Sequence, residues 1–287
     1  MNVTSESEFA ITDEFAREGY VFIKGLFDAC SASAAAAWLH AQEHSALAKS
    51  WTEQEPGIPL AVYSVVHAQK NPIAELVNNP QIIRIASKLM GAPTYIWSSK
   101  VNIKAPWCGS AEYYHQDLVY WKDRGYPRDD MLSCIVFLEK HSLSNAALHI
   151  IPGSHRDGLI EHHSFINING LSKRMVPPET MNNLFQNHGL KVIEADPGDA
   201  LFFHSSLVHG SSHNISPDGR MVLLAQLNTV GNEPLAVSEN AKRFNLERAR
   251  MEFEDAGRRY KYFKEKYEHQ LESDDLTFCP PIPKQER

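Results

Sequence analysis

Residues 199–230 read DALFFHSSLVHGSSHNISPDGRMVLLAQLNTV, two short apolar runs on either side of a polar turn. Such runs are typical of strands bounded by turn residues. The same texture begins after Pro93 and recurs in the segments TYIWSSKVNIK, EYYHQDLVYW, MLSCIVFLE, ALHIIPGSH and LKVIEA. Because no helical segment separates these short strands, they predict a β-sandwich or barrel and argue against a βαβ sheet.

The region before Pro93 is predicted to be mainly helical. The segment TDEFAREG, from Thr12, predicts a short helix closed by Gly19, and the alternating YVFIKGLF after it predicts a strand. An Ala-rich stretch from Ser31 to Lys49 and the stretch that begins at Pro72 carry apolar residues at helical spacing, so each of them predicts one helix. We therefore expect helices packed on one side of the β-rich region.

Beyond Pro234 an apolar stripe with alternating spacings of three and four predicts another helix. Gly257 interrupts the stripe, which favours a helix packed on the β domain and leaves a dimerisation helix as the alternative. The sequence thus predicts a β domain with N-terminal helices over 1–236, a C-terminal helix over 237–272 and a tail over 273–287.

The composition of the 287 residues limits the classes of function. Hydrophobic residues make up 43% and charged residues 22%, typical of a globular protein, and the net charge of −7 disfavours nucleic acid as a partner. No apolar run approaches the roughly 18 residues of a membrane span, and the polar first residues do not resemble a secretory leader. The four dispersed cysteines are expected to be reduced thiols. We expect a cytoplasmic protein that acts on a small molecule.

A candidate metal site lies in the predicted strand that contains His115-Gln116-Asp117. Residues i and i+2 of a strand share a face, so His115 and Asp117 can reach one ion, and His209 at a later strand end supplies a third ligand. Two histidines and a carboxylate suit Fe(II) and oxygen. A Zn(II) hydrolase remains an alternative, and His204 is predicted to be a packed core residue.

Several motifs, taken in order, resemble the phytanoyl-CoA dioxygenase family of Fe(II)- and 2-oxoglutarate-dependent oxygenases, which includes ectoine hydroxylase. The motifs are Glu18-Gly19-Tyr20, Tyr114-His115-Gln116-Asp117, Ile151-Pro152-Gly153-Ser154-His155, Pro197-Gly198-Asp199 and His209-Gly210-Ser211 through to Arg220. The resemblance implies a double-stranded β-helix, that is, a cupin-like jelly roll. It also implies Fe(II), 2-oxoglutarate and O2 as the reaction components, with hydroxylation of an unactivated C–H bond and release of succinate and CO2.

The resemblance assigns roles to individual residues. His115, Asp117 and His209 match the iron ligands, and Arg220 with Ser211 matches the clamp for the distal carboxylate of 2-oxoglutarate. Asn102 matches a residue on the co-substrate, and Trp121 matches an aromatic residue of the substrate site. Asp117 favours hydroxylation over halogenation, because halogenating relatives replace that carboxylate with a small residue.

The substrate is predicted from the residues around the motif. Tyr113 and Trp121 are candidates for its apolar contacts, and Lys104 is the main candidate for an anionic group. Other basic residues flank the motif, namely Lys100, Lys122, Arg124 and Arg128. They favour an anionic or zwitterionic metabolite such as an amino-acid derivative, a phosphonate or a natural-product intermediate. The alternatives are a non-catalytic cupin-like binding protein and an acyl-CoA hydroxylase of the same family.

Overall fold

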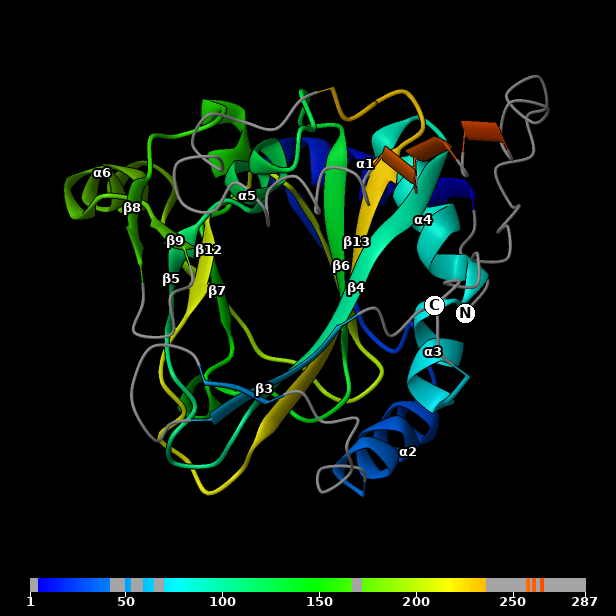
Figure 1. Cartoon of the computed structure of the whole chain (residues 1–287), viewed down its shortest axis with the longest axis vertical. Helices are drawn as coiled ribbons and strands as arrows, with labels where there is room; N and C mark the ends of the chain where they lie inside the picture. The colour runs from blue at the N-terminus through cyan, green and yellow to red at the C-terminus, as the bar shows by residue number, and fades with distance from the viewer. Residues whose placement is uncertain are drawn as a thin grey trace.

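The computed structural model of the chain describes residues 5–41, 50–52, 59–64, 70–166, 172–235, 257–258, 260–261 and 264–265. Two antiparallel sheets face each other and form its centre (Figure 1). The large sheet has the spatial order β1 (Tyr20–Ile23), β11 (Ala200–His204), β6 (Met131–Phe137), β13 (Arg220–Thr229), β4 (Thr94–Lys104), β3 (Pro59–Ser64) and β2 (Ser50–Thr52). The small sheet has the order β10 (Lys191–Ile193), β7 (Leu148–Ile150), β12 (His209–Ser211) and β5 (Glu112–His115).

This strand order confirms the predicted jelly roll. Strands that are distant in the sequence are neighbours in both sheets, as in β1–β11–β6 and β7–β12–β5, and every pair is antiparallel. A separate hairpin of β8 (His163–Ile166) and β9 (Ser172–Met175) lies beside β5 (Figure 1). Within the described chain the two sheets stay separate, so the barrel is formed by two facing sheets and is not closed by a continuous hydrogen-bond ladder.

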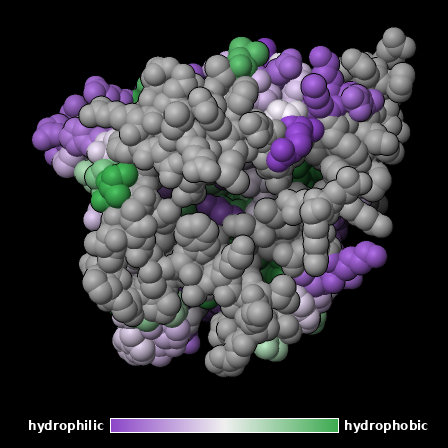
Figure 2. All heavy atoms as spheres, in the orientation of Figure 1, coloured by the Kyte–Doolittle hydropathy of each residue, from purple (hydrophilic) through white to green (hydrophobic). Residues whose placement is uncertain are grey.

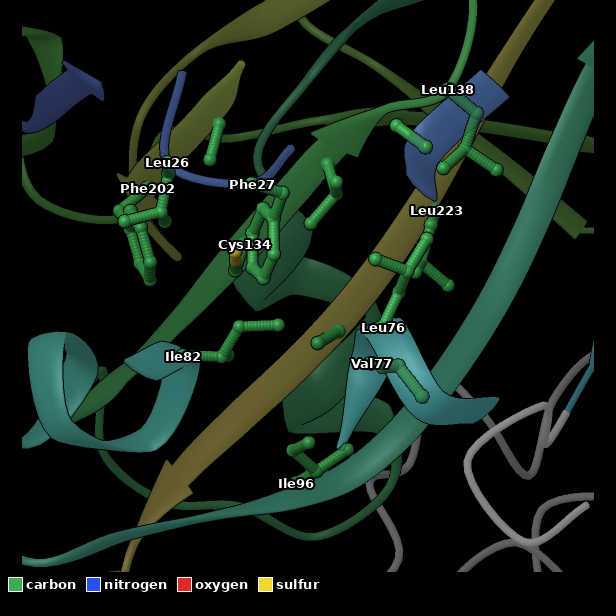
Figure 3. Packing of buried hydrophobic residues seen from close by; sticks show 14 of the residues in the cluster. Leu26, Phe27, Leu76, Val77, Ile82, Ile96, Cys134, Leu138, Phe202 and Leu223 are labelled. Carbon is green, nitrogen blue, oxygen red and sulfur yellow. The ribbon is translucent and has the colours of Figure 1, made fainter. Parts of the chain in front are cut away.

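Helices cover the outer face of the large sheet (Figure 1). They are α1 (Ser5–Glu18), α2 (Ala29–His40), α3 (Pro72–Val77) and α4 (Pro80–Met90). The main apolar core lies between these helices and the sheet, as the packing of Leu76, Ile82, Phe202 and Leu223 shows (Figure 3). A second core, which includes Phe137 and further residues of both sheets, fills part of the space between them. Burial on both faces explains why β6 is apolar except for Ser133 and why residues 221–225 of β13 form an unbroken apolar run.

The alternation of side chains along β13 decides which face each residue serves. Met221, Leu223 and Ala225 pack towards the helices, whereas Val222 and Leu224 pack towards the small sheet. The inner face of β13 therefore carries Arg220, Val222, Leu224 and Gln226 in that order. This inner face is the one directed towards the candidate functional site.

Two local predictions are wrong. The stretch from Pro72 forms two helices, because Asn79 caps α4 and Pro80, which lacks an N–H, cannot continue a helix from α3. The segment EYYHQDLVYW is also not one strand: β5 ends at His115, and α5 (Asp117–Asp123) begins two residues later. Leu118 and Trp121 are both buried, at the spacing of one helical turn, which favours the helix.

The remaining helix, α6 (Pro178–His188), lies outside the small sheet, and short 3₁₀ turns occupy Leu143–Asn145 and Ser154–Asp157. In the view of Figure 2, hydrophilic side chains predominate on the described surface and hydrophobic ones form isolated spots. No helix of the described part is both long enough and apolar enough to cross a bilayer. The described cysteines, Cys30, Cys108 and Cys134, are free thiols.

Most of the C-terminal region falls outside the described residues. Within the predicted helix 237–272, the described residues 257–258, 260–261 and 264–265 are helical. Tyr260 is buried in an aromatic cluster with Tyr95 and Trp97. The tail over 273–287 lies entirely outside the described part, so the domain boundaries stay a prediction.

Candidate metal centre and co-substrate site

The structure brings His115, Asp117 and His209 together between the two sheets. His115 ends β5 and lies directly opposite His209 of β12 in the strand register. Asp117 begins α5, so its carboxylate reaches the histidines from a helix and not from the predicted strand. The Nε2 atom of each histidine lies 3.8 Å from Asp117 Oδ1. The three candidate ligand atoms all lie within 4.8 Å of one another.

Hydrogen bonds orient each of the three side chains. His115 Nδ1 donates to the carbonyl of Tyr113 over 2.7 Å, and His209 Nδ1 donates to the carbonyl of Leu207 over 2.9 Å. Because a carbonyl oxygen can only accept, both Nε2 atoms present lone pairs towards the centre. Ser133 Oγ donates to Asp117 Oδ2 over 2.7 Å and leaves Oδ1 facing the histidines. An outer hydrogen bond on each ligand is the usual arrangement at a metal site.

The electrostatics of the cluster also suit a cation. Burial alone would raise the pKa of Asp117, but the adjacent imidazoles of His115 and His209 and the hydrogen bond from Ser133 lower this pKa well below its ordinary value. Burial and the neighbouring His115 lower the pKa of His209 to about 4. Near neutral pH the cluster therefore contains an ionised carboxylate and a neutral His209, which are the forms that bind a metal ion.

Gln116, between two of the candidate ligands, fixes the segment that carries them. Its backbone N–H donates to His162 Nε2, and its side-chain NH2 donates to the carbonyls of Gly158 and Ser206. Its Oε1 accepts from the backbone N–H of Ile160. Sequence reasoning missed this role. The signal for it is the position of Gln116 in the middle of the His-x-Asp motif, where its side chain must point away from the metal.

A buried guanidinium lies on the inner face beyond the triad. Arg220 begins β13, is 6% exposed, and donates from Nη2 to Ser211 Oγ over 3.3 Å. Its Nε is buried and has no hydrogen-bond partner, and Arg220 forms no ion pair with the residues that the structure describes. Burial lowers the pKa of Arg220 to about 10, so the group remains charged at neutral pH. A buried cation in this state is stabilised by an anionic ligand such as a carboxylate.

Lys104 lies in the same cluster and not at the surface. It faces Arg220 across the β4–β13 register, and its Nζ donates to Ser211 Oγ over 2.7 Å and to the carbonyl of Ser212 over 2.9 Å. Asn102 lies two residues before Lys104 on the same face, and its Oδ1 is buried with no partner among the described residues. The structure therefore groups Lys104 with Ser211 and Arg220, the residues matched to 2-oxoglutarate.

The other candidate substrate residues lie in different surroundings. Tyr113 is 44% exposed and contacts Phe165 edge-on, with 5.7 Å between ring centroids. Trp121 is 1% exposed and packs edge-on against Trp97 in the aromatic cluster. His204 packs against rings outside the triad, including that of Phe15, as expected of a core residue.

Most of the basic residues that flank the motif contact neighbouring groups. Lys122 donates to the carbonyl of Pro127, and Arg124 lies over the Trp97 ring. Arg128 forms an ion pair with Asp130 over 2.7 Å. These contacts give Lys122, Arg124 and Arg128 structural roles and weaken their claim to a substrate anion.

Comparisons with known proteins identify relatives of this chain. L-Proline trans-4-hydroxylase of Streptomyces griseoviridis is 32% identical over 172 residues, which are 56% of this chain and 64% of that protein, a little under two thirds of its length. Ectoine dioxygenase of Sphingopyxis alaskensis is 28% identical over 228 residues, covering 76% of this chain and 74% of that protein.

Solved structures of EctD from S. alaskensis share the fold. The structure with 2-oxoglutarate and 5-hydroxyectoine is 27% identical, covers 82% of this chain and 79% of that chain, and has a TM-score of 0.66. The structure with bound Fe is 26% identical, covers 81% and 79% of the two chains, and has a TM-score of 0.65. The family profile described as Phytanoyl-CoA dioxygenase (PhyH) matches residues 15–222. The chain therefore belongs to the phytanoyl-CoA dioxygenase family of Fe(II)- and 2-oxoglutarate-dependent oxygenases.

Proposed function

We propose that the protein hydroxylates a small polar metabolite, with Fe(II) held by His115, Asp117 and His209 and with 2-oxoglutarate held by Arg220. Two features together carry the proposal. The outer atoms of the triad are all hydrogen-bonded, and a buried guanidinium nearby has no counter-ion in the described chain. A triad alone would also suit Zn(II). The added charge of Arg220 is what a dicarboxylate co-substrate needs.

Each residue has a defined task in this function. Iron with 2-oxoglutarate supplies the oxygen-activating chemistry, while the protein supplies ligation, orientation and exclusion of water. The carbonyls of Tyr113 and Leu207 hold the imidazole rings in place. Ser211 and Arg220 present an O–H and N–H groups to the distal carboxylate, and a guanidinium can bind both oxygens of that carboxylate at once.

The relatives narrow the substrate class. One is named for L-proline and another for ectoine, both small molecules. We infer an anionic or zwitterionic metabolite for this protein, with an amino-acid derivative as the first choice. A carboxylate in the Asp117 position supports hydroxylation as the outcome.

The test uses purified protein under anaerobic conditions. Addition of Fe(II) and 2-oxoglutarate should give a weak visible charge-transfer band. After oxygen is admitted, a correct substrate should accelerate the release of succinate and the consumption of oxygen in a one-to-one ratio. A non-catalytic binding protein would release no succinate, and a Zn(II) hydrolase would need no 2-oxoglutarate. Stimulation by long acyl-CoA alone would support the acyl-CoA hydroxylase.

A further inference from the structure

A row of side chains crosses the inner face of the large sheet at the level of the candidate metal centre. Gln226 of β13 lies opposite Ser133 of β6 on one side and Ser98 of β4 on the other. Ser133 donates to Asp117 Oδ2, so this row touches a candidate iron ligand. Directly opposite residues of antiparallel strands share a face. The side chain of Gln226 therefore belongs to the face that bears the metal centre.

Gln226 lies mostly buried on this face, but its amide is not engaged by the described part of the protein. Gln226 is 8% exposed and forms no hydrogen bond with any residue that the structure describes. Asn228, two residues later on the same face, donates to Tyr95 Oη and to the carbonyl of Asn232. The amide atoms of Gln226 keep some contact with solvent, since neither is a fully buried atom without a partner. An accessible amide that the described residues leave unengaged, on the face that bears the metal centre, can hydrogen-bond a bound ligand.

Lys100 lies diagonally across from Gln226. It pairs with Leu224 in the register, and it follows Ser98 by two residues, so it shares the inner face. Lys100 is half-buried and forms neither an ion pair nor a hydrogen bond within the described part of the chain. Lys104, on the same face, is by contrast held by Ser211 and Ser212.

We propose that Lys100 and Gln226 bind a carboxylate of the prime substrate and thereby hold the substrate beside the metal centre. Diagonal neighbours on antiparallel strands are about 7–8 Å apart at their backbones, so two long side chains can meet on one group. An ammonium and an amide NH2 complement the two oxygens of a carboxylate. This inference rests on the proposed function and names the feature that the substrate must carry.

The site is distinct from the one matched to 2-oxoglutarate. Arg220 and Gln226 are separated along β13 by six residues, which at about 3.4 Å each is roughly 20 Å. Arg220 lies with Ser211 and Lys104, whereas Gln226 lies with Ser133 and Asp117. The inner face therefore presents two separate groups of donors, one for each of two carboxylate compounds.

The experiment titrates the anaerobic protein, loaded with Fe(II) and 2-oxoglutarate, with the free L-amino and imino acids and with the carboxamide of each. We expect at least one free acid to shift the charge-transfer band and to stimulate succinate release, while its carboxamide does neither. Lys100→Met and Gln226→Leu should weaken binding of that acid by about 10- to 100-fold, as expected for loss of one hydrogen bond to a charged group. The band before the acid is added, and the 2-oxoglutarate requirement, should not change.

Matched controls separate this effect from a general loss of charge or of an amide. Lys122→Met removes a lysine whose Nζ bonds only to a loop carbonyl, and Gln186→Leu changes an exposed glutamine of α6. Both should bind the acid as the wild type does. Gln226→Glu places a like charge at the site and should abolish binding of the acid, even if Gln226→Leu fails to fold.

The outcomes distinguish the two proposals. Absence of the band in the wild type would contradict the proposed function itself. If the band forms but no free acid shifts it, or if a carboxamide acts equally well, only the carboxylate site is wrong. A raised 2-oxoglutarate requirement in Lys100→Met would place Lys100 on the co-substrate and would also overturn the inference.

Discussion

The triad and Arg220 lie between the same two sheets, but they differ in hydrogen bonding: the triad is fully hydrogen-bonded and Arg220 is not. At the triad, each outer atom is satisfied: two carbonyls accept from the imidazoles, and Ser133 donates to Asp117. At Arg220, the Nε is buried and unpartnered. Metal ligands need fixed directions before the ion arrives, whereas a clamp needs an unneutralised charge that an incoming carboxylate can match.

This difference predicts that substitutions in the two regions have different effects. Changes at the triad should reduce metal binding and leave the clamp intact. Changes at the clamp should raise the demand for 2-oxoglutarate, because a buried guanidinium without a counter-ion gains most from a charged ligand.

The largest effect is expected for His209→Ala. Loss of one of three ligands should weaken Fe(II) binding by more than the roughly 10- to 100-fold typical of an orienting partner. The anaerobic charge-transfer band and turnover should both disappear. His213→Ala, on the exposed loop after β12, is the matched control and should behave as the wild type. Full retention of the band in His209→Ala would remove His209 from the metal centre.

Arg220→Ala should act on the co-substrate instead. Truncating one partner of a buried charge pair costs about 2–5 kcal/mol, which raises the 2-oxoglutarate requirement by roughly 30- to several-thousand-fold. Arg220→Lys should restore only part of the affinity, because an ammonium lacks the planar fork. Fe(II) affinity, measured without 2-oxoglutarate, should stay within about twofold of the wild type. An unchanged 2-oxoglutarate dependence would contradict the assignment of Arg220.

The contrast also explains what the sequence could predict. The candidate ligands and Arg220 were predictable because their residue types recur at fixed places in ordered motifs. The helix that carries Asp117 to the site was not predictable. The short apolar run DLVYW suits a strand or a helix equally well until the burial of its residues is known. Leu118 and Trp121 of this run are both buried and are one helical turn apart, and this burial is seen only in the structure.

Contacts of the large sheet with the small sheet and with α5 were the other limit. Ser133 reaches Asp117 from the large sheet, and Lys104 reaches Ser211 from the large sheet to the small one. Both contacts depend on how the large sheet faces these elements, which local pattern does not encode. The sequence predicted Lys104 on the same face as Asn102, but it could not show which ligand Lys104 would meet.

Ser133→Ala tests the outer support of the metal centre. It removes the donor to Asp117 Oδ2, so the carboxylate is less firmly oriented and Fe(II) binding should weaken by about 10- to 100-fold. The 2-oxoglutarate requirement at saturating Fe(II) should change little. Ser164→Ala, on the exposed face of β8, should leave Fe(II) affinity unaltered. Equal Fe(II) affinity in Ser133→Ala and the wild type would mean that Ser133 does not orient the ligand.

The smallest effect is expected for Lys104→Met. Its Nζ holds Ser211 Oγ at 2.7 Å, and Ser211 also accepts from Arg220 Nη2, so the ammonium supports the clamp from one side. Loss of one charge-assisted hydrogen bond, about 1.5 kcal/mol, should raise the 2-oxoglutarate requirement by about tenfold. Fe(II) affinity should be unchanged, and Lys122→Met should match the wild type in every measurement.

The direction of the Lys104→Met effect decides between two assignments. A higher 2-oxoglutarate requirement with an unchanged substrate KM places Lys104 with Arg220, as its contact with Ser211 indicates. A higher substrate KM with an unchanged 2-oxoglutarate requirement would instead restore Lys104 to the substrate site, as the sequence predicted. In that case Arg220 alone would supply the positive charge for the distal carboxylate, and Arg220→Ala and Lys104→Met should be independent. If Lys104 does support the clamp, the double variant should lose less than the sum of the two single free-energy changes, because both act through Ser211.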